Sequence, residues 1–210
     1  MGIQIQNVLS GFAKQGALWL GIGALSMGAV QAGDLILHPN GFGQHSYAAW
    51  KAQQGMPDDS GSSNQALYFQ KMTATTTFAA GVAVVEGIEG LPVEQLTGLS
   101  WYYRDDGHCG AGAPRWDVRI KPPTGPSYFF FIGCAAMAIT DMKPGPNGTQ
   151  FIQKSFVGPI PAVPGSIITG LEIVFDEGDD QGHGFVFLDN ITVQTSTMTK
   201  TWTCAADNGN

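Results

Sequence analysis

The chain has 210 residues, of which 10 are Lys or Arg and 17 are Asp or Glu, so its formal net charge is −7. No run of basic residues occurs, and this argues against binding to nucleic acid or to an anionic membrane surface through a basic patch. Hydrophobic residues make up 43% of the sequence, which is enough to build the core of a globular domain.

The first 32 residues have the features of a secretory signal peptide. Lys14 is the one charged residue before a continuous apolar run, Ala17–Val30, and an A-x-A-like cleavage sequence ends at Ala32. A membrane anchor is the alternative, but the run has fourteen residues, whereas a membrane-spanning helix needs about 20. We therefore predict cleavage after Ala32 and a secreted, extracellular or periplasmic protein that is not held in a membrane.

The predicted mature chain begins as a loop with one short helix over Tyr47–Gln54, with Ser46 as N-cap and Gly55 as stop. Strand signals start near Ala66, where short β-branched and aromatic runs alternate with clusters of Gly, Pro, Asn and Asp. These runs predict eight strands, over Leu67–Lys71, Phe78–Val85, Leu99–Arg104, Arg115–Ile120, Tyr128–Ile132, Phe151–Val157, Ile167–Phe175 and Phe185–Val193.

These elements predict an all-β fold, a single jelly-roll β-sandwich of about eight antiparallel strands with at most one short helix. The sequence shows no long amphipathic helix, internal repeat or linker, so residues 33–194 are expected to form one domain. The Thr-rich residues 195–210 follow the last predicted strand as a tail, which is either an additional edge strand or disordered.

Two of the three cysteines flank a predicted hairpin. Cys109 precedes the strand Arg115–Ile120, Cys134 follows the strand Tyr128–Ile132, and a Pro/Gly turn separates the two strands. Pairing of these strands would bring both thiols to the open end of the hairpin, which predicts a structural disulfide in an exported protein. The spacing does not match a zinc site. Cys204 is left over, and is either free or available for an intermolecular bond.

Alternation along two strands predicts a polar surface with an aromatic edge. Successive side chains of a strand point to opposite faces. Tyr102 and Arg104 share one face of their strand, and Arg115 and Asp117 share the outward face of the next. If the strands are neighbours, these four residues form one candidate ligand-binding surface for a sugar hydroxyl or a carboxylate. The alternative is a ladder of cross-strand ion pairs worth roughly 0.2–1 kcal/mol each, which needs no ligand.

The acidic loop before the last predicted strand suggests a calcium site. Asp176, Asp179, Asp180 and Asp189 offer the oxygen ligands that Ca²⁺ prefers, although their spacing matches no EF-hand. By strict alternation, Asp189 lies on the face of its strand that carries Phe187, Ile191 and Val193, where a bare carboxylate would be costly. The alternative is that Asp189 accepts hydrogen bonds from backbone N–H groups and the loop acids are solvated.

Catalytic signals are weak. A glycosidase needs two carboxylates about 5–9.5 Å apart. Glu172 and Asp176 lie further apart along one strand than the retaining geometry prefers, and the sequence shows no acid that would face Glu172 across a cleft. No G-x-S-x-G motif occurs, and the four histidines are scattered.

Several segments, taken in order, resemble a group of secreted bacterial jelly-roll proteins of the carbohydrate-binding-module or lectin type, whose function is uncharacterised. They are NQALYFQK, LSWYYR, CGAGAPRWDV, YFFFIGC and VFDEGDDQGHGFVFLDNITV, and they extend over most of Asn64–Val193. The resemblance implies a β-sandwich, a disulfide between Cys109 and Cys134 and no established catalytic residues.

The sequence therefore predicts a secreted, non-catalytic binding module for an extracellular glycan or a cell-surface ligand. The first alternative is a structural subunit of a surface layer or extracellular filament, favoured by the Gly- and Thr-rich composition and the odd Cys204. A glycan-active hydrolase is a second alternative. The partners expected from the sequence are an extracellular glycan or surface ligand and further copies of the chain, with calcium as a possible structural cofactor.

Overall fold

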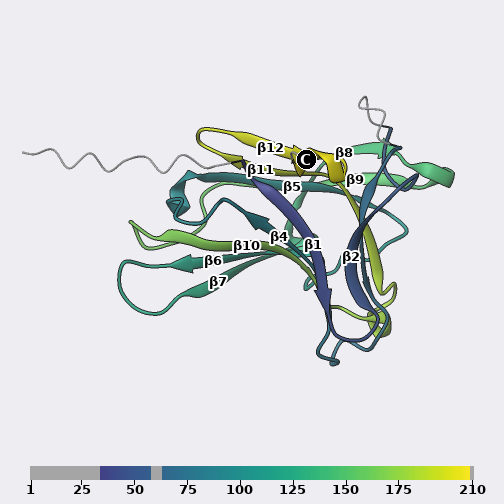
Figure 1. The fold of residues 1–210 in the computed structure, drawn as a ribbon, viewed down its shortest axis with the longest axis horizontal. Coiled ribbons are helices and arrows are strands. Elements are labelled where there is room, and N and C mark those ends of the chain that lie inside the picture. Colours follow the sequence, from purple (N-terminus) through teal and green to yellow (C-terminus); the bar gives the residue numbers. More distant parts are fainter. Residues whose placement is uncertain (1–33, 58–62, 209–210) are drawn as a thin grey trace, which may run out of the picture.

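The structure is a computed structural model that describes residues 34–57 and 63–208, and the predicted signal peptide lies outside these residues. Within the described part of the chain, twelve strands form two antiparallel sheets that pack face to face (Figure 1), and the helices are short 3₁₀ turns. The predicted all-β class is confirmed. No described helix has the length and apolar character that crossing a membrane would require.

One sheet has five strands. Its spatial order is β1 (Ile36–Phe42), β4 (Ala80–Glu86), β10 (Ile167–Phe175), β6 (Arg115–Lys121) and β7 (Tyr128–Gly133).

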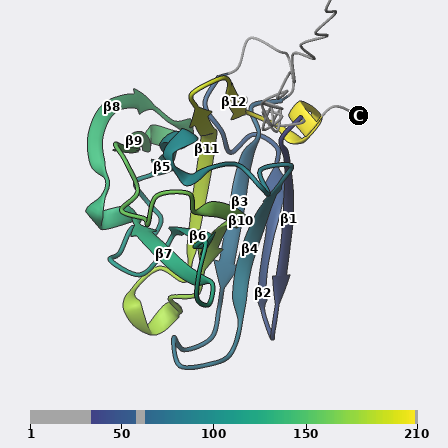
Figure 2. The same cartoon turned by 90° about the vertical axis from the view of Figure 1, so that its left-hand side faces the viewer.

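The other sheet has seven strands. Six of them follow the order β2 (Ser46–Lys51), β3 (Ala66–Lys71), β11 (Phe185–Thr195), β5 (Leu96–Arg104), β9 (Gln150–Val157) and β8 (Ala138–Pro144). The seventh, β12 (Thr199–Trp202), pairs with the second half of β11, beyond the stretch that pairs with β3. Figure 2 shows β8 and β9 at one side of the sandwich and β1 and β2 at the other.

The eight strands predicted from the sequence form the centre of both sheets. Numbered one to eight along the chain, they stand in the order 2-7-4-5 in the five-stranded sheet and 1-8-3-6 in the seven-stranded sheet. This alternation between two four-stranded layers is the order of a jelly roll.

The four strands that the sequence pattern missed are additions to this centre. β1, β2 and β8 extend the sheet edges, and β12 lies beside β11. The predicted helix over Tyr47–Gln54 is wrong, because its first part is strand β2, in which Ala48 and Trp50 face the core and Tyr47 and Lys51 face outward. Pairing with β3 outweighs the helical preference of the alanines there.

The core between the sheets is centred on two stacked indole rings. Trp101 of β5 and Trp116 of β6 are fully buried, with ring centroids 5.2 Å apart, so β5 and β6 face each other across the sandwich. The predicted tail contributes Trp202 and Cys204 to the buried residues. The strand alternative for the tail is therefore correct, and the Cys204 thiol is free but enclosed.

The predicted hairpin and disulfide are both present. β6 and β7 pair antiparallel, and Cys109 and Cys134 are bonded with their Cα atoms 5.3 Å apart. The bond joins the loop before β6 to the turn after β7. A structural disulfide fits an oxidising compartment.

Removing this disulfide is expected to destabilise the protein without changing its fold. For a sequence separation of 25, loop-closure entropy predicts a loss of about 3.5 kcal/mol in the free energy of unfolding for a Cys109→Ala/Cys134→Ala variant. Urea unfolding checks this value. A reducing agent should lower the unfolding midpoint of the wild type and leave that of the variant unchanged, and equal midpoints for the two oxidised proteins would contradict the account.

Candidate functional site

The outer face of the seven-stranded sheet is partly apolar. Besides the core between the sheets, a second cluster of buried side chains lies on this face, with Tyr68 and Phe185 packed at its border. Strand alternation explains the cluster, because β3, β5 and β11 each turn alternate apolar residues away from the main core. Its buried members are Met56, Ala66, Tyr102, Phe151 and Phe187.

A β-bulge in β11 sets which side chains reach the outer face. The register between β11 and β5 shifts after Asp189, and Asn190 has a left-handed backbone with φ of 45°. Asp189 therefore shares the outer face with Phe187, as predicted, whereas Ile191 and Val193 point into the main core. The predicted common face with Ile191 and Val193 is wrong, because strict alternation does not hold across the bulge.

Asp189 holds the segment after β2 against the outer face. Its side chain is buried, Oδ2 accepts the Met56 N–H at 2.7 Å, and Oδ1 accepts the Asn190 N–H at 2.7 Å. The neighbouring Gly55 permits this close approach, since a Cβ atom there would stand 2.1 Å from the Gln65 carbonyl oxygen. The alternative that Asp189 accepts backbone N–H groups is confirmed.

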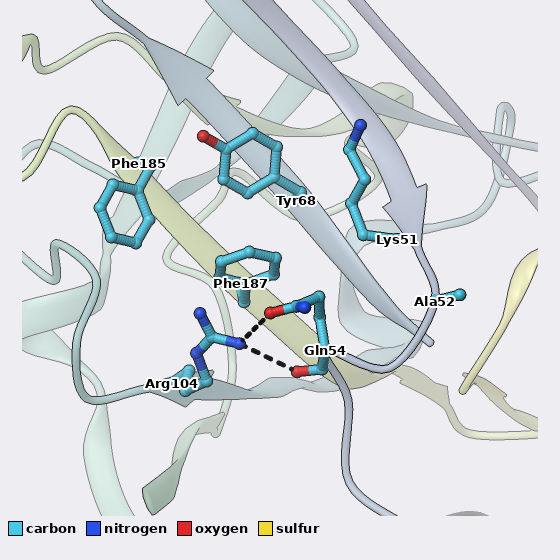
Figure 3. Close-up of a pocket in the computed structure, with 7 residues that line it drawn as sticks. All are labelled: Lys51, Ala52, Gln54, Tyr68, Arg104, Phe185 and Phe187. Atoms are coloured by element: carbon cyan, nitrogen blue, oxygen red, sulfur yellow. Dashed lines mark hydrogen bonds between the residues drawn. The ribbon is translucent and has the colours of Figure 1, made fainter. Parts of the chain in front are cut away.

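A pocket of about 410 Å³ opens between this held segment and the aromatic residues of the sheet (Figure 3). Three rings form its apolar part: the Tyr68 and Phe187 centroids are 4.7 Å apart, and those of Phe185 and Phe187 are 6.0 Å apart. Three polar side chains complete it from β2, the following segment and β5. The lining residues are Lys51, Ala52, Gln54, Tyr68, Arg104, Phe185 and Phe187.

Arg104 is fixed in position on the pocket side of β5. Its guanidinium lies over the Phe187 ring, with Cζ 3.7 Å from the ring centroid. Nε and Nη2 donate to the two carboxylate oxygens of Asp106 at 2.6 and 3.0 Å, and Nη1 donates to Oε1 and to the main-chain oxygen of Gln54. These hydrogen bonds and the contact with Phe187 hold the Arg104 guanidinium in one orientation at the side of the pocket.

Lys51 stands on the opposite side of the pocket. Its Nζ lies 5.4 Å from the Tyr47 ring centroid and 5.9 Å from that of Tyr68. The Tyr68 hydroxyl donates to Gln70 Oε1. The pKa of Tyr68 is raised, mainly because the ring is partly buried and to a smaller extent because Tyr47 is near. Tyr68 therefore stays neutral at physiological pH, and Lys51 brings positive charge to the pocket rim.

The four residues of the predicted ligand-binding surface do not form one surface. β5 and β6 belong to different sheets, so the condition for that surface is not met. Arg104 lines the pocket, and Tyr102 lies on the same face, where its hydroxyl donates to Asp141 Oδ2 at 2.6 Å. Arg115 and Asp117 lie on the outer face of the five-stranded sheet and pair with each other at 2.7 Å.

A second hollow, of about 400 Å³, lies over the five-stranded sheet near Arg115 and Asp117. Glu172 of β10 stands directly opposite Asp117 of β6, an acid on the neighbouring strand of the same sheet that the sequence alone did not pair with it. The Asp117 side chain is only 7% exposed and Arg115 donates to it, which leaves it poorly accessible to a substrate. Arg115 also pairs with Asp176 at 2.6 Å. The ion-pair ladder considered from the sequence describes this surface better than a catalytic pair does.

The structure does not bring the four candidate calcium ligands together. Asp176 pairs with Arg115, and Asp180 accepts the Thr75 N–H and hydroxyl at 2.7 and 2.6 Å. Asp189 lies in the middle of β11, on the outer face of its sheet, where it accepts the Met56 N–H. Asp179 lies in the 3₁₀ turn η4 (Asp179–Gln181). Within residues 34–57 and 63–208, no group of three or more His, Cys, Asp or Glu side chains is placed to hold a metal ion.

Sequence reasoning found Arg104 but missed the rest of the pocket. The alternation in ALYFQK and FVFLD places Tyr68, Phe185 and Phe187 on one side of their strands, which was a usable signal. The sequence does not predict Lys51 and Gln54 as pocket residues, because the helix wrongly predicted over Tyr47–Gln54 places them on no strand of this sheet. The chain matches no protein-family model, and a comparison with curated proteins finds no match. The predicted resemblance to secreted bacterial jelly-roll proteins therefore stays a prediction.

Substituting Asp189 by Ala is expected to destabilise the protein strongly. The change leaves the buried Met56 N–H without its acceptor, at roughly 1–3 kcal/mol, and also removes the acceptor of the half-buried Asn190 N–H. Urea unfolding provides the measurement. Asp179→Ala is the matched control, because Asp179 is exposed, and it should change stability by less than about 0.5 kcal/mol. Equal effects of the two substitutions would contradict the role given to Asp189.

Asp117 should make stability fall as pH rises through the mildly acidic range. Burial raises the pKa of Asp117 to about 6, against the lowering effect of Arg115, whereas its pKa in the unfolded chain is about 3.9. Between these values the folded state retains a proton that the unfolded state has lost, so stability decreases from about pH 4 to about pH 6, by on the order of 3 kcal/mol.

Unfolding midpoints measured across this range for the wild type and Asp117→Asn test this expectation. In Asp117→Asn, most of the fall in stability between about pH 4 and about pH 6 should be absent. A smaller part should persist through Glu172, because burial also raises the pKa of Glu172. Parallel pH profiles for the two proteins would show that Asp117 is not the group responsible.

Proposed function

We propose that this protein is a secreted, non-catalytic module that binds an extracellular glycan in the pocket on its seven-stranded sheet. The observation that carries the proposal is the composition of the pocket: three aromatic rings next to a few fixed polar groups. Ligand sites of small molecules are typically concave, mostly apolar and aromatic, with a small number of placed polar groups that set orientation.

The chemistry of a sugar fits these surfaces. The faces of aromatic rings carry negative potential and attract the weakly positive C–H groups on one side of a pyranose ring. Phe185 and Tyr68 are both half-buried and offer such faces. The amide of Gln54 can hydrogen-bond hydroxyl groups at the edge of the sugar.

The pocket favours binding over catalysis. The described residues that line it carry no carboxyl, imidazole, thiol or aliphatic hydroxyl group. Hydrolysis of a glycosidic bond normally requires two carboxyl groups beside the bond. Asp106, which pairs with the lining residue Arg104, accepts an Arg104 N–H on each of its two carboxylate oxygens.

Secretion is part of this proposal. The support is the signal-peptide pattern of the first 32 residues together with the Cys109–Cys134 disulfide. The structural-subunit alternative predicts polymers of the purified protein, which electron microscopy would detect.

A glycan array probed with the purified protein, with and without calcium, tests the proposal. For a glycan that binds, Tyr68→Ala and Phe185→Ala should each weaken affinity by at least about tenfold, which corresponds to about 1.4 kcal/mol. Phe78→Ala is the matched control, because Phe78 is 87% exposed and lies beside the other sheet, and it should bind as the wild type does.

Two results would overturn the proposal. One is the absence of binding to every glycan of the array by a folded protein. The other is binding that survives both substitutions in the pocket, because the ligand would then lie elsewhere.

A further inference from the structure

The hydrogen-bond donors of the pocket outnumber its acceptors. Arg104 has five N–H donors, and four of them are used: two by Asp106 and two by Gln54. One N–H on Nη2 is left. The Gln54 amide nitrogen adds two donors, since its Oε1 already accepts from Arg104.

Lys51 adds three more donors and a full positive charge. In the part of the chain that the structure describes, Lys51 forms no ion pair with a carboxylate, and its contacts are the Tyr47 and Tyr68 rings. Figure 3 shows its ammonium group on the side of Tyr68, across the pocket from Arg104. Lys51 as a residue is half-buried, and the faces of the two rings hold its ammonium group at the edge of the pocket, where an anion can reach it.

Few hydrogen-bond acceptors belong to the described residues that line the pocket. Asp106 is not one of these lining residues and already accepts two N–H groups of Arg104, and the Tyr68 hydroxyl donates its proton to Gln70, which leaves only the lone pairs of that oxygen. Arg104 is paired with Asp106, so among the described residues that line the pocket Lys51 is the cation without a carboxylate partner. Its charge is opposite in sign to that of the whole chain, whose formal net charge is −7.

From this balance of donors and charge, we propose that the glycan bound here is acidic, with the carboxylate of a hexuronate-type sugar on Lys51 and the sugar ring against Phe185 and Tyr68. The inference rests on the proposed function and adds the class of sugar to it. A carboxylate supplies four lone-pair acceptor sites and one negative charge, which match the unused donors of Arg104 and Gln54 and the charge of Lys51. A neutral sugar would leave the Lys51 charge without a counterpart.

The test compares acidic polysaccharides with the same polymers after their carboxylates have been reduced to hydroxymethyl groups. Polygalacturonate, alginate, hyaluronate and polysialic acid serve as probes, each in both forms, with a sulfated galactan as a separate arm. Binding by the full mature protein is measured by affinity electrophoresis and calorimetry. We expect at least one native acidic polymer to bind, and its reduced form to bind at least about tenfold more weakly.

Variants of Lys51 test whether the binding of acidic polymers depends on this residue. Lys51→Met keeps the apolar stem and removes the charge, and it should lower affinity for the native acidic polymer by about tenfold or more. Lys51→Arg should retain most of the binding. Lys121→Met is the matched control, because Lys121 is an exposed lysine on the other sheet whose Nζ contacts the Gly125 carbonyl, and it should have no effect.

The outcomes separate this inference from the proposed function. Equal binding of native and reduced polymers, or unchanged binding by Lys51→Met, overturns the acidic-sugar inference and leaves glycan binding intact. Binding of the sulfated galactan alone also overturns it, because the recognised group would not be a carboxylate. Failure of every polymer, acidic or neutral, to bind the folded protein overturns both.

Discussion

The pocket depends on one buried carboxylate. Asp189 reaches the outer face of the seven-stranded sheet because β11 bulges immediately after it, and there its two oxygens accept the N–H groups of Met56 and Asn190. The first bond ties the segment after β2 to the sheet and the second stabilises the bulge itself. Gln54 lies two residues before Met56 and accepts hydrogen bonds from Arg104. The positions of Gln54 and Arg104 in the pocket therefore depend on the hydrogen bond between Asp189 and Met56. Asp189 thus links the bulge of β11 to the position of the pocket residues that follow β2.

The charged side chains on the two faces of the sandwich differ in whether other residues of the protein pair with them. Over the five-stranded sheet, Arg115 is balanced by Asp117 and Asp176. Buried Lys71, which ends β3 of the other sheet but lines the same hollow, donates to three backbone carbonyls, so these charges are met by the protein itself. On the seven-stranded sheet, Arg104 is balanced by Asp106, but Lys51 is met only by aromatic rings among the described residues. Charges satisfied internally contribute to structure, whereas an uncompensated charge beside an aromatic pocket is available to a ligand.

Local sequence patterns predicted the centre of the fold and little of the site. Eight strands with clear turn signals gave the jelly roll, and the hairpin between Arg115 and Ile132 gave the disulfide. Edge strands such as β8 are exposed along their whole length and carry no hydrophobic alternation, so no pattern marks them. Which strands become neighbours is set by long-range packing, so local alternation cannot show that Tyr102 and Arg104 lie on a different sheet from Arg115 and Asp117. The bulge at Asn190 likewise arises from pairing with β5, and it moved Ile191 and Val193 to the other face from Asp189.

We propose that ligands bind at the pocket between Lys51 and Arg104. The most direct measurement is an NMR map of the backbone amide signals that shift when an acidic oligosaccharide is added to the ¹⁵N-labelled protein. The account predicts that the largest shifts fall on Lys51–Gln54, around Tyr68, at Arg104 and on Phe185–Phe187, the residues that form the pocket. Shifts concentrated instead around Val84, Asp117 and Glu172 would place the ligand on the five-stranded sheet and contradict it.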